Sequence, residues 1–449
     1  MPSQIFNVAL RFPSTAIFRG QARRTSSNAT LARWTLRWAQ CRPRYSSSWP
    51  SSPARTPPIK VGSTVRDRYE VLHCLARQKH STIWLVKDAD AQFGQYLAMK
   101  VQSPHKPLPP CGCSGAQHLI TMADYEKDDH SGAGALPILL DAFALPSPEG
   151  PDGRAVECLV MPLFGESIRT LYHPGARALP WDVLKQVCIS LCFAVDFLHV
   201  KGVVHTDIHP DNILIQPKAR NETAVVEAFL AGLDPTKDHV GPVPFPKVER
   251  RELSVALTDL ENAHLVANDS KHDFLIQPHH LRAPEVILGA PWGPKADIWN
   301  LGCLIFEWAT SRLLFEHDTE TGDPQAILRG MVHTLGNFPP ALIAQGRHAH
   351  KWFNSDGSLM SPPKHVGLGL ETLIFYGLMG ADDYRPPLPS SFNDHELALF
   401  MDFLHLMVRL DPEERWSGIE LVGHPWLHDT LGEIIEVMRE EEAERNARS

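Results

Sequence analysis

A carboxylate and a carboxamide, Asp207 and Asn212, stand five residues apart in a polar segment that follows directly on a long apolar pattern. From Trp181 to Val200, apolar residues recur at 184, 187, 188, 191, 192, 195, 197 and 198, which predicts a buried helix. A strand-like run, Ile213–Ile215, comes immediately after the polar segment. The chain therefore must place an acid and an amide in a loop between a core helix and a strand.

The periodicity of the chain changes along its length. Three short strand-like runs suit an antiparallel meander, and a further run follows them: Tyr69–Leu72, Thr82–Val86, Tyr96–Val101 and Cys158–Met161. Helical patterns dominate afterwards, at Ala296–Ser311, Glu396–Leu410 and Glu433–Arg445, and one short helix is expected earlier, near Ala116–Glu126. The predicted fold class is α+β and bilobal, with a small β-rich N-lobe and a larger helical C-lobe.

This change of pattern divides the chain into four segments. We expect a basic N-terminal segment with a linker at 1–66, an N-lobe with hinge at 67–164, a C-lobe at 165–428 and a charged C-terminal helix at 429–449. Within the C-lobe, residues 216–252 look like a polar, proline-containing insertion.

Charge and hydropathy exclude two classes of function. The 43 basic and 52 acidic residues give a net charge of -9, which argues against direct nucleic-acid binding and leaves room for a basic partner. The most apolar stretch, Gln186–Val200, is interrupted by Asp196, so no membrane span is expected.

The first 66 residues have a composition of their own. They contain ten Arg and one Lys but no Asp or Glu, and they are rich in Ser. That composition is typical of a mitochondrial transit peptide, and Arg44–Ser47 resembles a cleavage site. A basic disordered tail or a wrongly assigned start codon would look the same, so mitochondrial targeting is an expectation with these alternatives open.

Four further motifs occur in the order that a protein kinase requires. They are Ala98-Met99-Lys100, Leu257-Thr258-Asp259-Leu260-Glu261, Arg282-Ala283-Pro284-Glu285 and Asp297–Cys303. Together with the loop at His205–Ile215 they resemble the signature set of the protein kinases. The resemblance implies that Lys100 binds the α/β-phosphates of ATP, Asp207 is the catalytic base, and Asn212 and Asp259 hold Mg²⁺. Arg415 is placed to pair with Glu285.

Other motifs narrow the resemblance to one group of kinases. Ser81–Asp88, the His-Thr-Asp loop, Leu140–Phe143, Gly165–Arg169 and Ile276–Glu285 resemble the SR-protein kinases, and most closely their fungal serine/threonine-kinase relatives, from Tyr69 to Leu427. The resemblance implies ATP and Mg²⁺ as cosubstrate and cofactor, and a protein substrate phosphorylated on Ser, often in Arg/Ser-rich sequence. Relatives of this type would suggest cytoplasm and nucleus, against the mitochondrial expectation.

The same resemblance assigns an adenine site. Leu75 and Ile83 are candidates for its apolar cover, and Cys158–Gly165 is the expected hinge. Met161 would be the gatekeeper. Pro162 lacks an N–H but keeps the carbonyl that an adenine amino group needs, and Phe164 could supply the N–H.

The chain departs from the family pattern at four places. Ala76 and Gln78 replace the glycines of the nucleotide loop, His209 replaces a lysine that contacts the γ-phosphate, and Glu261 replaces a glycine, adding bulk and negative charge near the metal site. No clear glutamate pairs with Lys100: Glu126 is in poor register, and Gln117 or His118 stands nearer the usual place.

Three hypotheses remain open on the sequence alone. Lys100, Asp207, Asn212 and Asp259 are all retained, which favours an active serine/threonine protein kinase. The four departures keep open a pseudokinase that acts as a nucleotide-binding or protein-binding scaffold. A kinase of small molecules is disfavoured by the Arg282–Glu285 motif. Thr206 stands where most kinases have an arginine that binds an activation-loop phosphate, so we do not expect such a switch.

Overall fold

The computed structural model describes most of the chain from residue 59 onward. The described residues are 59–78, 80–91, 95–102, 130–145, 156–172, 178–217, 222–234, 239–245, 253–266, 273–315, 324–363, 368–379 and 388–448. The basic N-terminal segment up to residue 58 and the helix expected near Ala116–Glu126 lie outside them.

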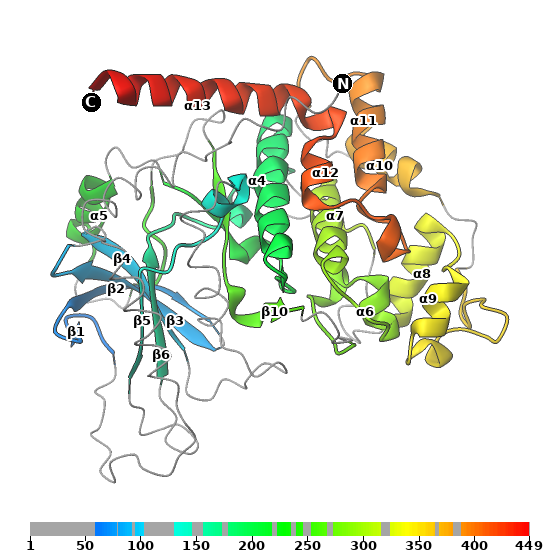
Figure 1. The fold of residues 1–449 in the computed structure, drawn as a ribbon, viewed down its shortest axis with the longest axis horizontal. Helices are drawn as coiled ribbons and strands as arrows, with labels where there is room; N and C mark the ends of the chain where they lie inside the picture. The colour runs from blue at the N-terminus through cyan, green and yellow to red at the C-terminus, as the bar shows by residue number, and fades with distance from the viewer. Residues whose placement is uncertain are drawn as a thin grey trace, which may run out of the picture.

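The described part of the N-lobe is a twisted antiparallel sheet with the order β1-β2-β3-β4-β6-β5 (Figure 1). Its strands are β1 (Thr64–Val65), β2 (Tyr69–Arg77), β3 (Ser81–Asp88), β4 (Tyr96–Gln102), β5 (Asp141–Leu145) and β6 (Val156–Pro162). Alternate side chains of β4 serve the two faces: Leu97 and Met99 pack in one apolar cluster, and Tyr96 and Ala98 in another. The predicted meander is confirmed, and Lys100 falls on the face that carries Ala98.

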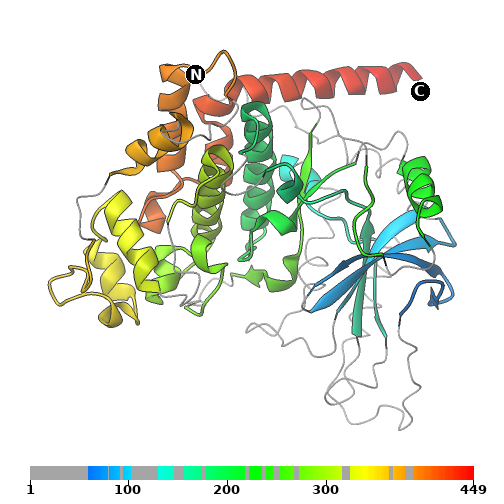
Figure 2. The same ribbon diagram turned by 180° about the vertical axis from the view of Figure 1, so that it is seen from behind.

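The C-lobe is built around two buried helices, α4 (Trp181–Val200) and α7 (Lys295–Thr310), which stand side by side in both views (Figures 1 and 2). Around them lie α6 (Pro284–Leu288), α8 (Pro324–Leu335), α9 (Pro340–Gln345), α10 (Leu370–Met379), α11 (Asp394–His405), α12 (Gly418–Val422) and α13 (His428–Arg448). The periodicity placed α4, α7, α11 and α13 to within a few residues. By length and hydropathy α4 could cross a membrane, but 83% of that window is buried inside the protein, as expected of a core helix.

Two short antiparallel ribbons connect the helices to the loops of the site. One pairs β7 (Val203–Val204) with β10 (His264–Leu265), and the other pairs β8 (Ile213–Ile215) with β9 (Val255–Leu257). β7 and β8 flank the segment that carries Asp207 and Asn212, and β9 and β10 flank the segment that carries Asp259. The two ribbons therefore hold both functional segments against each other.

The described parts of the insertion expected at 216–252 are mostly exposed or partly exposed, but a few of their apolar residues pack against the N-lobe. Its helix α5 (Glu222–Ala231) lies beside the N-lobe sheet (Figure 1), and Val226 and Val243 are fully buried against Leu85, Tyr96 and Ala98. The sequence analysis did not predict this contact, which an apolar stripe of the helix makes: Val225, Val226, Phe229 and Leu230.

A buried ion pair ties the Arg282–Glu285 motif to the rest of the C-lobe. Arg415 Nη1 and Nη2 lie 2.7 Å from Glu285 Oε1 and Oε2, and both side chains are almost completely buried. The guanidinium also donates to the backbone carbonyls of Arg409 and Lys295 and lies over the ring of Trp299. The predicted pair is confirmed. Hydrogen bonds to the Glu285 carboxylate and to the two backbone carbonyls satisfy the donors of the buried guanidinium.

Candidate active site

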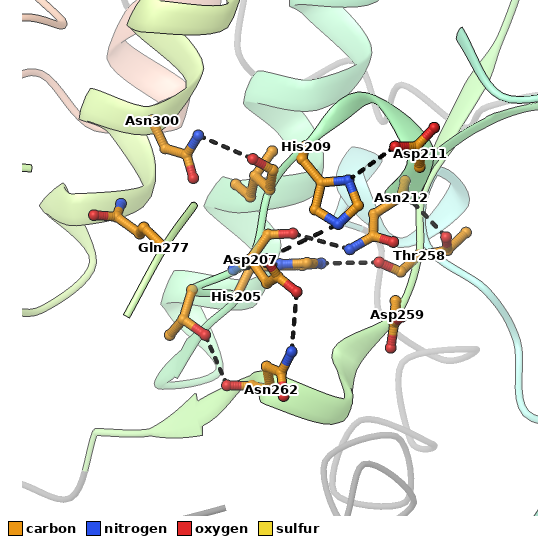
Figure 3. A network of polar contacts seen from close by, with 12 residues as sticks. His205, Asp207, His209, Asp211, Asn212, Thr258, Asp259, Asn262, Gln277 and Asn300 are labelled. Carbon is orange, nitrogen blue, oxygen red and sulfur yellow. Dashed lines mark hydrogen bonds and ion pairs between the residues drawn. The ribbon is translucent and has the colours of Figure 1, made fainter. Parts of the chain in front are cut away.

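Helix α7 fixes the backbone of the loop that carries Asp207. The buried carboxylate of Asp297 accepts hydrogen bonds from the backbone N–H groups of His205 (2.8 Å) and Thr206 (2.9 Å). Asn300 Nδ2 donates to the carbonyl of Ile208 at 2.9 Å (Figure 3). These bonds satisfy polar backbone groups that would otherwise be buried without partners. The loop is thus held by α7 whether or not the Asp207 carboxylate is present.

The side chain of Asp207 is partly exposed and is oriented by Asn262, while Asn212 holds the Asp207 backbone. Asn262 Nδ2 donates to Asp207 Oδ2 at 2.9 Å, and Asn212 Nδ2 donates to the Asp207 carbonyl at 3.0 Å (Figure 3). Nothing in the sequence pattern marks Asn262 as a partner of Asp207. Asp207 keeps about a quarter of its side-chain surface exposed, so a carboxylate with a fixed direction faces solvent, as an acceptor of a substrate proton must.

Asn212 and Asp259 come together because their segments are bonded to each other. The backbone N–H of Thr258 donates to the carbonyl of Asn212 at 2.7 Å, and its hydroxyl donates to the same oxygen. Asp259 follows with left-handed backbone angles, φ 67° and ψ 62°. The bond from Asn212 Nδ2 to Asp207 turns the amide oxygen of Asn212 away from that contact. A carboxylate and an amide oxygen are hard oxygen ligands, so this pair fits Mg²⁺.

Lys100 lies at the centre of the charged part of the site. It sits on β4 opposite Ile83 and Leu159, and its ammonium is buried 2.9 Å from Asp259 Oδ1 and 3.0 Å from Glu261 Oε1. Burial lowers the pKa of Lys100, but the negative charges of Asp259 and Glu261 raise it by more, so the pKa lies above its ordinary value. Lys100 therefore carries a positive charge, and its two carboxylate partners offset the cost of burying that charge.

The candidates for the adenine site lie on the strands of the N-lobe sheet and on the segment that leads from it into the C-lobe. Leu75 and Ile83 are partly buried in the apolar cluster that contains Ala98 and Leu163. Pro162 ends β6, and Phe164 follows on the segment that leads into the C-lobe, half-buried. Phe245 of the insertion packs in the same cluster and would lie 3.5 Å from a Cβ at Gly165.

The nucleotide loop without glycines is a tight hairpin. Arg77 pairs with Thr82 across β2 and β3, and the Gln78 N–H donates to the Ser81 carbonyl at 2.8 Å. The Ser81 hydroxyl donates to Gln78 Oε1 at 2.6 Å. Gln78 thus closes the turn with its side chain, a role that glycine cannot fill, while Ala76 stays in the strand opposite Ile83.

His209 stands between two carboxylates. Its Nε2 lies 3.9 Å from Asp207 Oδ1 and its Nδ1 lies 3.7 Å from Asp211 Oδ2 (Figure 3). Burial lowers the pKa of His209, but the interaction with Asp211 and the charge of Asp207 raise it by more, and the net pKa is above its ordinary value. Asp211 is held in turn by a bidentate contact with Arg169.

The start of the activation segment is ordered by neutral hydrogen bonds. Thr206 Oγ1 donates to the Asn262 carbonyl at 2.7 Å, and the Thr206 carbonyl accepts from the Gln277 N–H at 3.0 Å. The Gln277 side chain bonds the carbonyl of Ala296 and the N–H of Ala283. In the sequence, Gln277 is recognisable only as part of the Ile276–Glu285 motif, and nothing there predicts this bridging role. Thr206 therefore takes part in a neutral network of hydrogen bonds, and the absence of a phosphate-dependent switch stays a prediction.

Comparison with known proteins agrees with this geometry. The protein kinase domain model matches residues 156–427, more than half of the chain. A serine/threonine protein kinase of Aspergillus fumigatus is 28% identical over 82% of this chain and 87% of its own length. The serine/threonine-protein kinase SRPK of Physarum polycephalum is 25% identical over 83% and 88%, and mouse SRSF protein kinase 3 is 36% identical over the same shares.

Proposed function

The chain belongs to the protein kinase family as a serine/threonine protein kinase, and on that premise we propose that it uses Mg²⁺ and transfers the γ-phosphoryl group of ATP to serines in Arg/Ser-rich proteins. The observation that carries the proposal is the spatial convergence of Lys100, Asp207, Asn212 and Asp259, which come from three separate segments of the chain. A scaffold without activity would not need all four in place.

Each of these residues has a role that phosphoryl transfer requires. Asp207 accepts the proton of the substrate hydroxyl, and its direction is set by Asn262. Lys100 supplies positive charge for the phosphates, and Asn212 and Asp259 would hold the metal ion. Held there, Mg²⁺ would supply positive charge to offset the negative charge of the phosphates. Because phosphoryl transfer depends on position and charge, the protein has to supply little else.

Two observations support an Arg/Ser-rich substrate. Two of the relatives are named as SRPK and SRSF protein kinase 3, and the chain carries a net charge of -9, which favours a basic partner. We expect a peptide of Arg-Ser repeats to be phosphorylated with a kcat/KM at least about 10-fold above that of the same peptide with every Arg replaced by Ala, as loss of one charge-assisted contact would give. Equal kcat/KM values for the two peptides would remove the proposed substrate class and leave the kinase assignment intact.

The histidine in place of the phosphate-binding lysine leads to a pH-dependent prediction. Protonated His209 can stabilise negative charge on the phosphates, and because its pKa is raised, the protonated fraction grows as pH falls from 8 to 6. The rate of single-turnover transfer with saturating ATP should therefore increase over that range.

His209→Lys would place a permanent charge at the same position. This variant should be faster than the wild type at pH 8 by about 5- to 150-fold, which corresponds to about 1–3 kcal/mol in the barrier. It should also lose most of the pH dependence between 6 and 8. Equal rates for the two proteins together with a flat profile would show that position 209 does not act on the phosphates.

A further inference from the structure

Glu261 contacts the phosphate lysine directly. Its carboxylate is buried, with 7% of the side chain exposed, and Oε1 lies 3.0 Å from Lys100 Nζ. From the sequence we expected a glutamate in place of glycine to add bulk and negative charge near the metal site. In the structure the Glu261 carboxylate contacts the Lys100 ammonium, as does the carboxylate of Asp259 two residues earlier. Among the described residues, the carboxylates within ion-pair distance of Lys100 are those of Asp259 and Glu261.

A second side chain of β4 holds Glu261 in this position. Gln102 is two residues beyond Lys100 and therefore on the same face of the strand. Its Nε2 donates to Glu261 Oε1 at 3.2 Å and to Glu157 Oε2 at 2.9 Å. Two adjacent positions on one strand face thus bind the same carboxylate oxygen, one as an ammonium and one as an amide. Such a paired contact fixes direction as well as distance.

The turn that carries Glu261 is fixed from the C-lobe. Asp259 is followed by a short 3₁₀ turn, Leu260–Asn262, in which Leu260 is buried in the C-lobe core. The same turn presents Asp259 to Lys100, Glu261 to Lys100 and Gln102, and Asn262 to Asp207. One turn therefore sets the metal carboxylate, the phosphate lysine and the catalytic carboxylate relative to one another.

We propose that Glu261 is the positioning residue that holds Lys100 in place for the nucleotide phosphates, the role that a glutamate from a helix has in the kinases that this chain resembles. The inference rests on the proposed function. The carboxylates of Asp259 and Glu261 together hold the Lys100 ammonium, at 2.9 Å and 3.0 Å. With Asp259 as its only anionic partner, the long, flexible lysine stem would lose its direction.

The opposite role for Glu261 predicts effects of opposite sign. If Glu261 were a lock that withholds Lys100 from phosphates, removing its charge would free the lysine and tighten the binding of anionic nucleotides. Simple loss of a nearby negative charge would also tighten that binding. Weaker binding after removal of the charge would therefore show that Glu261 supports Lys100 and does not withhold it from the phosphates.

The test compares ADP and adenosine by calorimetry with the full-length protein and without divalent metal, so that Asp259 holds no ion. Glu261→Gln keeps the shape of the side chain and its contact with Gln102. We expect it to weaken ADP binding at least about fivefold and to change adenosine binding less than about twofold, because adenosine has no phosphate for Lys100. In a Lys100→Met background the same substitution should no longer weaken ADP binding.

Two more variants complete the design. Glu157→Gln removes the same charge from the same neighbourhood but does not contact Lys100, and its ADP affinity should stay within about twofold of the wild type. Glu261→Gly restores the residue of related kinases, yet it should lower the rate of Mg·ATP-dependent transfer. Retained adenosine binding shows that each variant is folded.

The outcomes separate the inference from the function on which it rests. Failure of the wild type to bind ADP or ATP, with or without Mg²⁺, would overturn the proposed function itself. Normal binding by the wild type with equal or tighter ADP binding by Glu261→Gln would overturn only the role of Glu261. A gain in transfer rate for Glu261→Gly would do the same and would identify Glu261 as inhibitory.

Discussion

Replacement of Asp207 by Asn is expected to lower the rate of phosphoryl transfer by about 10²- to 10⁴-fold, the usual contribution of a positioned general base. The amide cannot accept the proton of the substrate hydroxyl, and the described structure offers no second carboxylate that Asn262 orients in the same way. The measurement is the single-turnover rate with saturating ATP and Mg²⁺.

The fold and nucleotide binding serve as controls for Asp207→Asn. The loop is held by Asp297 and Asn300 through backbone groups, and the amide oxygen of the new residue can still accept from Asn262. The melting temperature and its increase on addition of Mg·ADP should therefore match those of the wild type. A variant that transfers phosphate at the wild-type rate would show that Asp207 is not the base.

Replacement of Arg415 by Leu is expected to reduce the free energy of unfolding by about 3–5 kcal/mol. The pair with Glu285 is fully buried, so removal of the guanidinium leaves a carboxylate in the C-lobe interior without its counter-charge, and the carbonyls of Arg409 and Lys295 lose a donor. Equilibrium unfolding in urea measures the loss as a lower midpoint.

The chain contains a matched control for this prediction. Arg169 contacts Asp211 with the same bidentate geometry, at 2.7 and 2.8 Å, but about half of each side chain is exposed. Arg169→Leu should cost no more than about 1 kcal/mol, because water screens the pair and replaces it. Equal losses for the two variants would mean that burial does not determine what the Arg415–Glu285 pair contributes.

Features that depend on local pattern could be predicted from the sequence. The apolar stripe of α4 and the alternation along β4 each fix an element without knowledge of the rest of the chain. The order of the motifs then places Lys100, Asp207 and Asp259 near one another. The Arg415–Glu285 contact was also predictable, because Glu285 ends a recognisable kinase motif and Arg415 stands where the kinase pattern places its partner.

Features that depend on packing between distant segments could not be predicted. The contact of Gln102 with Glu261 joins residues 159 positions apart, and nothing local marks either as a partner of the other. On the sequence alone, Glu261 adds bulk and negative charge near the metal site; only the structure shows that the charge faces Lys100. The insertion was recognised by its polar, proline-containing composition, which does not predict that some of its apolar residues pack against the N-lobe sheet.

The central claim is that this site transfers phosphate and does more than bind nucleotide. The most direct measurement incubates the wild type with γ-labelled ATP and an Arg-Ser repeat peptide, with Mg²⁺ or with a chelator, and locates the label by mass spectrometry. The account predicts phosphoserine that forms only with Mg²⁺ and disappears in both Asp207→Asn and Lys100→Met. Binding of Mg·ATP without any transfer to this or other protein substrates would contradict it.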